Sequence, residues 1–178
     1  MITKEMILSG ISAGVVELIR EYRDGLVLYL NSILRDIGTA EEICEDTFVK
    51  LVTKRPRFSG RSSFRTWLYA IGRNLALDHL RRNAKLTALP EAESLADMES
   101  LEQGYIREER RIVVHRAMGK LNPEYRQVLW LSYFEEFTNA ETAKLMKKSK
   151  RQVENLLYRA KQSLRTELEK EGITHEDL

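Results

Sequence analysis

The stretch SSFRTWLYAIGRNLALDHLRR, residues 62–82, decides the fold, because helical periodicity and positive charge run through it together. Its apolar side chains recur at helical spacing in two adjacent rows: Phe64, Leu68, Ala76 and Leu80, then Trp67, Ile71 and Leu75. Two such rows make one wide apolar face, so the stretch predicts an amphipathic helix packed on a core. We place Trp67 in that core rather than in a stack on DNA, which is the alternative.

The other side of this helix carries basic, amide and phenol groups. From residue 55 to residue 90, eight basic residues stand against Asp78 alone. Guanidinium groups pair with phosphates, and tyrosine and asparagine side chains can contact exposed bases. A charged face that serves only solubility is the alternative, and the shortage of acids argues against it. The candidate nucleic-acid contacts on this side are Arg65, Tyr69, Arg73, Asn74, Arg81 and Arg82.

Two further helices are predicted upstream of this one. Apolar residues recur at spacings of three and four between residues 18 and 34. A second helix follows, where Thr39 and Glu42 have the spacing of a capping box. Pro56 and Gly60 end that helix and bracket a short basic loop. The three helices therefore predict one all-helical unit.

Residues 85–105 differ from their surroundings, because they are rich in carboxylates and have only a weak apolar pattern. We expect an acidic linker here, either a plain solvated tether or a segment with a function of its own. A second helical unit, residues 106–178, follows it. The chain thus predicts an all-α fold of two small helical domains, the first of them spanning residues 1–84.

The second unit has the pattern of a helix-turn-helix. Asn122 predicts an N-cap before a proline, the first position of one helix. Two capping boxes follow, Thr138 with Glu141 and Ser149 with Gln152. They start a short helix and a long basic helix, as in a helix-turn-helix, although another helical hairpin could show this spacing.

The last long helix divides into an apolar and a polar side. Arginine and asparagine suit bidentate contacts with base edges, and lysine suits phosphates. The sequence therefore predicts one basic helix in each half of the chain that contacts nucleic acid. The candidate contacts on the last helix are Lys150, Arg151, Gln152, Asn155, Tyr158, Arg159 and Lys161.

Composition bounds the remaining possibilities. The net charge of the 178 residues is only +2, but two basic blocks flank the acidic linker, which suggests two contacts with a polyanion. No run of about 18 apolar residues and no leader pattern is present, so we expect neither membrane insertion nor export. The single cysteine, Cys44, fits a cytoplasmic protein and a buried thiol, with a redox sensor as the alternative.

Catalysis is a poor competitor. His79, His115 and His175 are scattered, and no glycine-rich loop could cradle a phosphate. The linker carboxylates have no fixed framework for acid–base chemistry. We expect no enzyme activity, no metal ion and no cofactor.

Two segments carry a family resemblance. AEEICEDTFVKLV with RFSGRSSFRTWLYAIGRNLALDHLRR resembles region 2 of bacterial sigma factors of the extracytoplasmic-function (ECF) group. KLNPEYRQVLWLSYFEEFTNAETAKLMKKSKRQVENLLYRAK is similar to their region 4. The resemblance covers nearly the whole chain and implies an alternative sigma factor for promoter-specific initiation in a stress or signal response. Its implied partners are RNA polymerase core and promoter DNA, and an anti-sigma factor often holds such proteins inactive.

The resemblance also implies three sets of site residues. The main polymerase-binding surface would comprise Glu41, Glu42, Glu45, Asp46, Phe48 and Val49. The −10 element would be opened and read by Arg61 and Ser62 together with the six helix contacts named above. The seven candidates on the last helix would read the −35 element in the major groove. The acidic linker would thread toward the polymerase active site and RNA exit path.

Some positions depart from the family pattern. Lys147 stands where relatives commonly have a glycine at the turn, and Lys148 where they have an apolar residue. A left-handed backbone at a residue other than glycine costs about 1 kcal/mol or more, so the −35 contacts could differ. Leu156 and Thr142 also depart from the usual residue types. Two alternatives remain: a stand-alone helix-turn-helix regulator, and a degenerate sigma-like protein that binds polymerase without starting transcription.

Overall fold

The structure is a computed structural model, and it describes residues 13–86 and 109–173. Within those ranges the chain is helical and has no strand, which confirms the predicted all-α class. The linker predicted at residues 85–105 lies outside the described residues, except for its first two, which continue a helix. The elements are α2 (Ala13–Leu34), α3 (Ile37–Lys54), α4 (Phe64–Leu86), α6 (Glu109–Gly119), α7 (Pro123–Leu129), the π-helix η1 (Trp130–Phe134), α8 (Asn139–Met146) and α9 (Lys150–Lys170).

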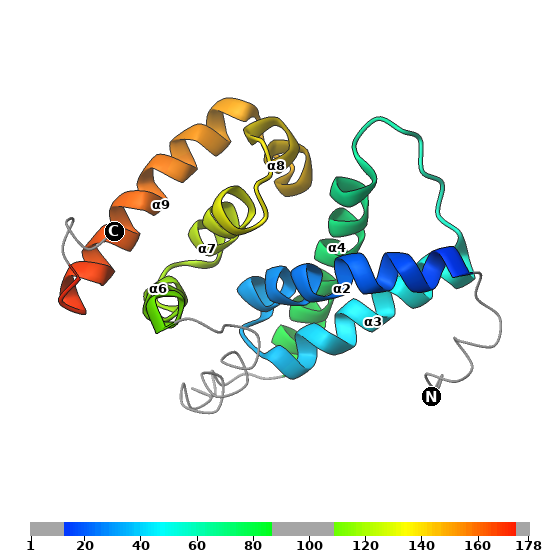
Figure 1. The fold of residues 1–178 in the computed structure, drawn as a ribbon, viewed down its shortest axis with the longest axis horizontal. Coiled ribbons are helices and arrows are strands. Elements are labelled where there is room, and N and C mark those ends of the chain that lie inside the picture. The colour runs from blue at the N-terminus through cyan, green and yellow to red at the C-terminus, as the bar shows by residue number, and fades with distance from the viewer. Residues whose placement is uncertain (1–12, 87–108, 174–178) are drawn as a thin grey trace.

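The first domain is a bundle of α2, α3 and α4. In Figure 1, α2 and α3 run close together and α4 crosses them. Leu30 of α2, Ile43 of α3 and Leu68 of α4 are buried in one core. The apolar face predicted from the 62–82 stretch therefore packs inward at Leu68 and Ala76, whereas Leu80 of the same predicted row is 39% exposed, and the helix extends to Leu86.

The start of α3 differs from the prediction. Asp36 is the N-cap, and its carboxylate accepts a hydrogen bond from the main-chain nitrogen of Gly38 at 3.2 Å. Thr39 lies inside the first turn, where its hydroxyl donates to the same carboxylate. The predicted Thr39–Glu42 capping box is wrong, because an aspartate three residues earlier already satisfies the start of the helix.

The caps of the second domain are confirmed. Asn122 caps α7, with its side-chain oxygen 2.9 Å from the main-chain nitrogen of Tyr125. Thr138 with Glu141 starts α8, and Ser149 with Gln152 starts α9, each as a reciprocal capping box. The predicted helix-turn-helix therefore forms with α9 as its second helix.

The two domains share one continuous core. Helix α2 contacts α7, and α4 contacts α8, so the second domain lies against two helices of the first. Arg126 of α7 is buried at this junction, and its Nε donates to the main-chain oxygen of Ser32, 2.9 Å away. The domains are thus joined by buried polar and apolar contacts as well as by the chain.

Candidate nucleic-acid interface

Helix α9 presents its predicted contacts to solvent. Val153 and Ala160 are fully buried on its inner side. On the outer side Tyr158 is 67% exposed. The side-chain oxygen of Gln152 accepts a hydrogen bond from the main-chain nitrogen of Ser149 in the capping box, at 2.8 Å. All seven predicted −35 residues are exposed: Lys150, Arg151, Gln152, Asn155, Tyr158, Arg159 and Lys161.

The turn before α9 is left-handed even though it lacks the glycine of the family pattern. Lys147 adopts a left-handed conformation, with φ 55° and ψ 47°, at the end of α8. Lys148 follows it, and its Nζ lies 2.9 Å from a carboxylate oxygen of Glu124 on α7. The two lysines therefore preserve the turn geometry despite the missing glycine, and Lys148 ties the turn to the rest of the domain.

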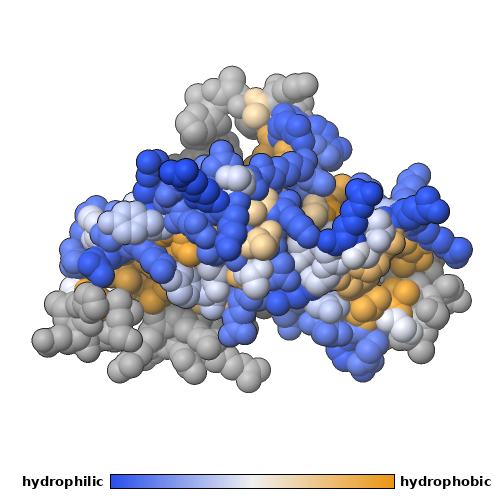
Figure 2. Space-filling model, turned by 90° about the horizontal axis from the view of Figure 1, so that it is seen from above, coloured by the Kyte–Doolittle hydropathy of each residue, from blue (hydrophilic) through white to orange (hydrophobic). Residues whose placement is uncertain are grey.

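The basic side of α4 is divided. Asn74, Arg81 and Arg82 are exposed, and so is Arg61 in the loop before the helix, while Ser62 is half-buried. Figure 2 shows the molecule from above the view of Figure 1, with hydrophilic side chains over most of the visible surface.

The other three predicted contacts on α4 face the second domain. Arg65 forms an ion pair with Glu135, which follows η1. Tyr69 is only 1% exposed, and its hydroxyl donates to the same carboxylate at 2.8 Å. Arg73 Nε donates to the side-chain oxygen of Gln127 on α7, 3.3 Å away. The outward position predicted for this row is corrected here, because the second domain packs over it.

Burial shows in the chemistry of Tyr69. Removal from water raises the pKa of its phenol, and the neighbouring Glu135 carboxylate raises that pKa further. The phenol therefore stays protonated and serves as a hydrogen-bond donor to Glu135.

Four aromatic rings gather where the loop meets α4. Trp67 lies 5.1 Å from Phe58 and 5.6 Å from Phe64, measured between ring centroids, and Tyr22 lies 5.8 Å from Phe64. Trp67 is half-buried and Phe58 is exposed. The core position predicted for Trp67 is therefore confirmed only in part, because the residue is half-buried.

The acidic side of α3 is open. Glu42, Glu45 and Asp46 are exposed, and Glu41 and Val49 are half-buried. Phe48 is 5% exposed and belongs to the core. Phe48 therefore lies on the inner side of α3, and its ring packs in the core opposite the exposed acids.

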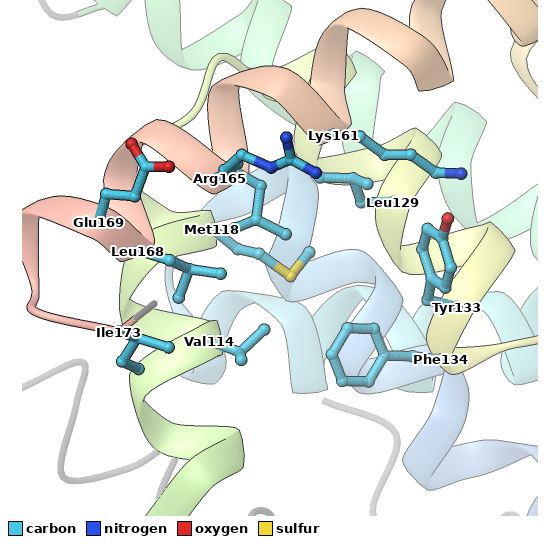
Figure 3. A pocket seen from close by; sticks show the side chains of 11 residues that line it. Val114, Met118, Leu129, Tyr133, Phe134, Lys161, Arg165, Leu168, Glu169 and Ile173 are labelled. Atoms are coloured by element: carbon cyan, nitrogen blue, oxygen red, sulfur yellow. The ribbon is translucent and has the colours of Figure 1, made fainter. Parts of the chain in front are cut away.

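An apolar groove opens on the second domain between α6, η1 and α9. Figure 3 shows Val114 and Met118 on one wall, Leu168 on another, and the rings of Tyr133 and Phe134 at one end. The ammonium of Lys161 lies 5.3 Å from the centroid of the Tyr133 ring. One of the predicted −35 residues therefore borders this groove.

Nothing in residues 13–86 and 109–173 groups three metal-ligating side chains. No helix in the same ranges is long and apolar enough to cross a membrane.

Comparison with known proteins agrees with this geometry. The family model for Sigma-70 region 2 matches residues 18–86, and that for Sigma-70, region 4 matches residues 111–164. RNA polymerase sigma factor YlaC of Bacillus subtilis is 29% identical over 161 residues, covering 88% of this chain and 93% of the relative. ECF RNA polymerase sigma factor SigC of Mycobacterium tuberculosis is 28% identical over 144 residues, covering 79% and 76%.

This chain belongs to the ECF sigma factors. The resemblance stated from the sequence is thereby confirmed, and with it the function of an alternative sigma factor in transcription initiation. The sigma factor RpoE of Bartonella quintana, solved with the anti-sigma factor NepR, superposes with a TM-score of 0.68 at 16% identity, covering 89% of this chain and 98% of that one. CnrH, solved with the cytosolic domain of CnrY, gives 0.63 at 23% identity, covering 93% and 94%. Both likenesses support the fold of this sigma factor.

Sequence reasoning missed Glu135, Gln127 and Phe137 as neighbours of the α4 face. Glu135 and Glu136 are adjacent acids, and only the backbone after η1 decides which one points inward. Two adjacent acids in a helical domain give no signal of such a contact.

Proposed function

We propose that this sigma factor binds RNA polymerase core through α3 and directs it to promoters that α4 and α9 recognise. The observation that carries the proposal is the exposed polar side of α9, which follows a left-handed turn and keeps all seven predicted contacts free of the core. Arg151, Asn155 and Arg159 are the best readers of base edges, because their side chains can make bidentate hydrogen bonds.

Recognition of the −10 element is assigned to the first domain, residues 1–84, and of the −35 element to residues 106–178. On α4, the exposed Asn74, Arg81 and Arg82 are available to a melted strand together with Arg61. Single-stranded DNA is bound by cations that pair with phosphates and by planar groups that stack on bases. The exposed ring of Phe58 and the half-buried ring of Trp67 supply such planar groups near the start of the helix, on the side of Arg61 along the chain.

Polymerase binding is assigned to the open side of α3. Glu42, Glu45 and Asp46 form a solvated acidic surface on a helix whose inner side is locked into the core by Phe48. Such a surface suits a basic partner patch, with Val49 as its apolar contact. The chemistry of RNA synthesis then belongs to the polymerase, and the sigma factor acts in the cytoplasm without a cofactor. An anti-sigma factor stays a prediction from the family.

The test is the association of purified RNA polymerase core with the Glu45→Arg and Asp46→Arg double variant. Charge reversal at two exposed sites leaves the core untouched, so the variant should fold and should lose polymerase binding by at least about tenfold. The control is Glu17→Arg, the same charge reversal at an exposed acid of α2, which should bind as the parent does. Unchanged association of the double variant would reject α3 as the polymerase surface.

A further inference from the structure

The reciprocal capping box at the start of α9 fixes the direction of one exposed amide. The main-chain nitrogen of Ser149 donates to the side-chain oxygen of Gln152 at 2.8 Å, and the main-chain nitrogen of Gln152 donates to the Ser149 hydroxyl at 3.1 Å. A main-chain N–H needs an acceptor, and in a glutamine side chain that acceptor is the carbonyl oxygen. The oxygen of Gln152 is therefore turned back to Ser149, and its NH₂ group is left for a contact outside the helix.

The cap itself does not require an amide. In the box at the start of α8, Glu141 has the position that Gln152 has in α9, and its carboxylate accepts from the main-chain nitrogen of Thr138 at 2.9 Å. A carboxylate also gains from the positive end of the helix dipole, which an uncharged amide does not. What Gln152 offers and a glutamate lacks is the NH₂ donor, so the role of the amide lies in that donor.

Gln152 lies on the same outer row of α9 as two assigned base readers. Residues three and seven positions further along a helix share one side, and these are Asn155 and Arg159, both exposed. The inner side of the helix is buried through Val153 and Ala160. In a helix-turn-helix, the first residues of the second helix meet the base edges. A DNA duplex read by α9 would therefore meet the NH₂ group of Gln152.

The major groove offers two kinds of base edge to such a donor. Guanine O6 and thymine O4 accept hydrogen bonds there, whereas adenine N6 and cytosine N4 carry NH₂ groups that donate. Each base pair therefore shows a keto oxygen on one strand and an amino group on the other. The usual pairing of glutamine with adenine uses both the oxygen and the NH₂ group, and the oxygen of Gln152 is already engaged by Ser149.

We propose that Gln152 is a specificity-determining residue for the −35 element and selects a keto base, guanine or thymine, on the strand that its NH₂ group faces. Adenine and cytosine are rejected at this position, because two NH₂ donors would face each other and lose their bonds to water. The capping box fixes the donor before DNA binds, so little side-chain freedom is lost in the contact. The proposal rests on the reading of the −35 element by α9.

The experiment is transcription in vitro by the full chain with RNA polymerase core, from promoters randomised in the −35 segment and identified by a barcode in each transcript. In the parent, one position should favour a keto base over an amino base by at least about threefold. The enriched base itself distinguishes guanine from thymine. Gln152→Glu keeps an acceptor for the cap, as Glu141 does in α8, but replaces the NH₂ group by an oxygen. The same position should then favour adenine or cytosine, and the other positions should keep their preferences.

Two further variants separate base reading from charge and from capping. Gln162→Glu makes the same change at another exposed glutamine of α9, in a later turn, so it should leave every base preference as in the parent. Gln152→Ala removes the donor without adding charge, so the preference at that one position should be lost. Circular dichroism checks that each variant is folded, and Gln152→Ala decides the matter if Gln152→Glu does not fold.

The outcomes distinguish this role from the function on which it rests. Unchanged preferences at every position in both Gln152 variants would overturn the role of Gln152, while two enriched elements in the parent would still support the sigma-factor function. A parent preference for adenine or cytosine at the position that Gln152→Ala affects would also overturn it. A parent that binds polymerase but enriches no −35 element would overturn the reading by α9, and with it the role of Gln152.

Discussion

Arg126 of α7 and Ser32 of α2 are joined across the two domains by a buried hydrogen bond, from Nε to the main-chain oxygen, at 2.9 Å. The same guanidinium also donates to the main-chain oxygen of Leu121. Arg126→Ala would leave two buried carbonyl groups unsatisfied, so we expect a loss of about 2–3 kcal/mol in the free energy of unfolding. Urea titration followed by circular dichroism measures it. Arg151→Ala, an exposed change on α9, should stay within about 0.5 kcal/mol, and an equal loss in both would refute the buried role.

The left-handed turn at Lys147 yields a prediction of the opposite sign. Glycine adopts φ 55° without the clash that a Cβ causes, so Lys147→Gly should stabilise the protein by about 1 kcal/mol. Gln162→Gly, in the exposed middle of α9, should destabilise it by about 1 kcal/mol. Thermal melts of the two variants should therefore shift in opposite directions, and parallel shifts would contradict the turn geometry.

The outer side of α9 should separate two kinds of DNA contact. Arg151→Ala should relax the preference at one base pair of the −35 element and cost about 1–3 kcal/mol at the best site. Lys150→Ala should weaken binding to all sites alike. It should also reduce, by about one, the slope of the logarithm of the binding constant against the logarithm of the salt concentration. Sequenced transcripts from a promoter library measure both effects. Lys170→Ala, at the far end of the helix, is the control. If Arg151→Ala weakens binding to all sites equally, Arg151 does not read a base.

Cys44 should be inert while the protein is folded. Burial raises the pKa of its thiol to about 12, and its sulfur lies 3.8 Å from the main-chain oxygen of Arg23. The thiolate is the reactive form, so almost none of it exists at pH 8 in the folded state, whereas an unfolded cysteine has a pKa of about 8.5. Iodoacetamide should therefore label the chain only in urea. Fast labelling of the folded protein would revive the redox-sensor alternative.

The faces and most ends of the helices were predictable because their causes are local. Asn122, Thr138 and Ser149 cap helices through groups three residues away, and Val153 and Ala160 follow the helical period. The cap of α3 was not predicted. Asp36 and Thr39 are both residue types that cap helices, and the sequence alone does not decide between them.

The junction between the domains lay beyond sequence patterns. Tyr69 sits at the border between the apolar and basic sides of α4, and its direction is set by Phe137 and Glu135, more than sixty residues away. Glu135 is turned inward by the π-helix before it, which depends on main-chain hydrogen bonds. These bonds cannot be predicted from the residue types. Three of the eight candidate −10 residues, Arg65, Tyr69 and Arg73, were thus wrongly placed in space, because they face the second domain.

The most direct test of the sigma-factor account is in vitro transcription with bacterial RNA polymerase core, this protein and a library of randomised promoters. Sequencing of the transcripts should show two enriched elements at a fixed spacing, and their enrichment should vanish in the Glu45→Arg and Asp46→Arg double variant. Polymerase that binds the protein yet makes no promoter-specific transcripts would favour a degenerate, accessory role. Absence of binding between the protein and the core would contradict the account.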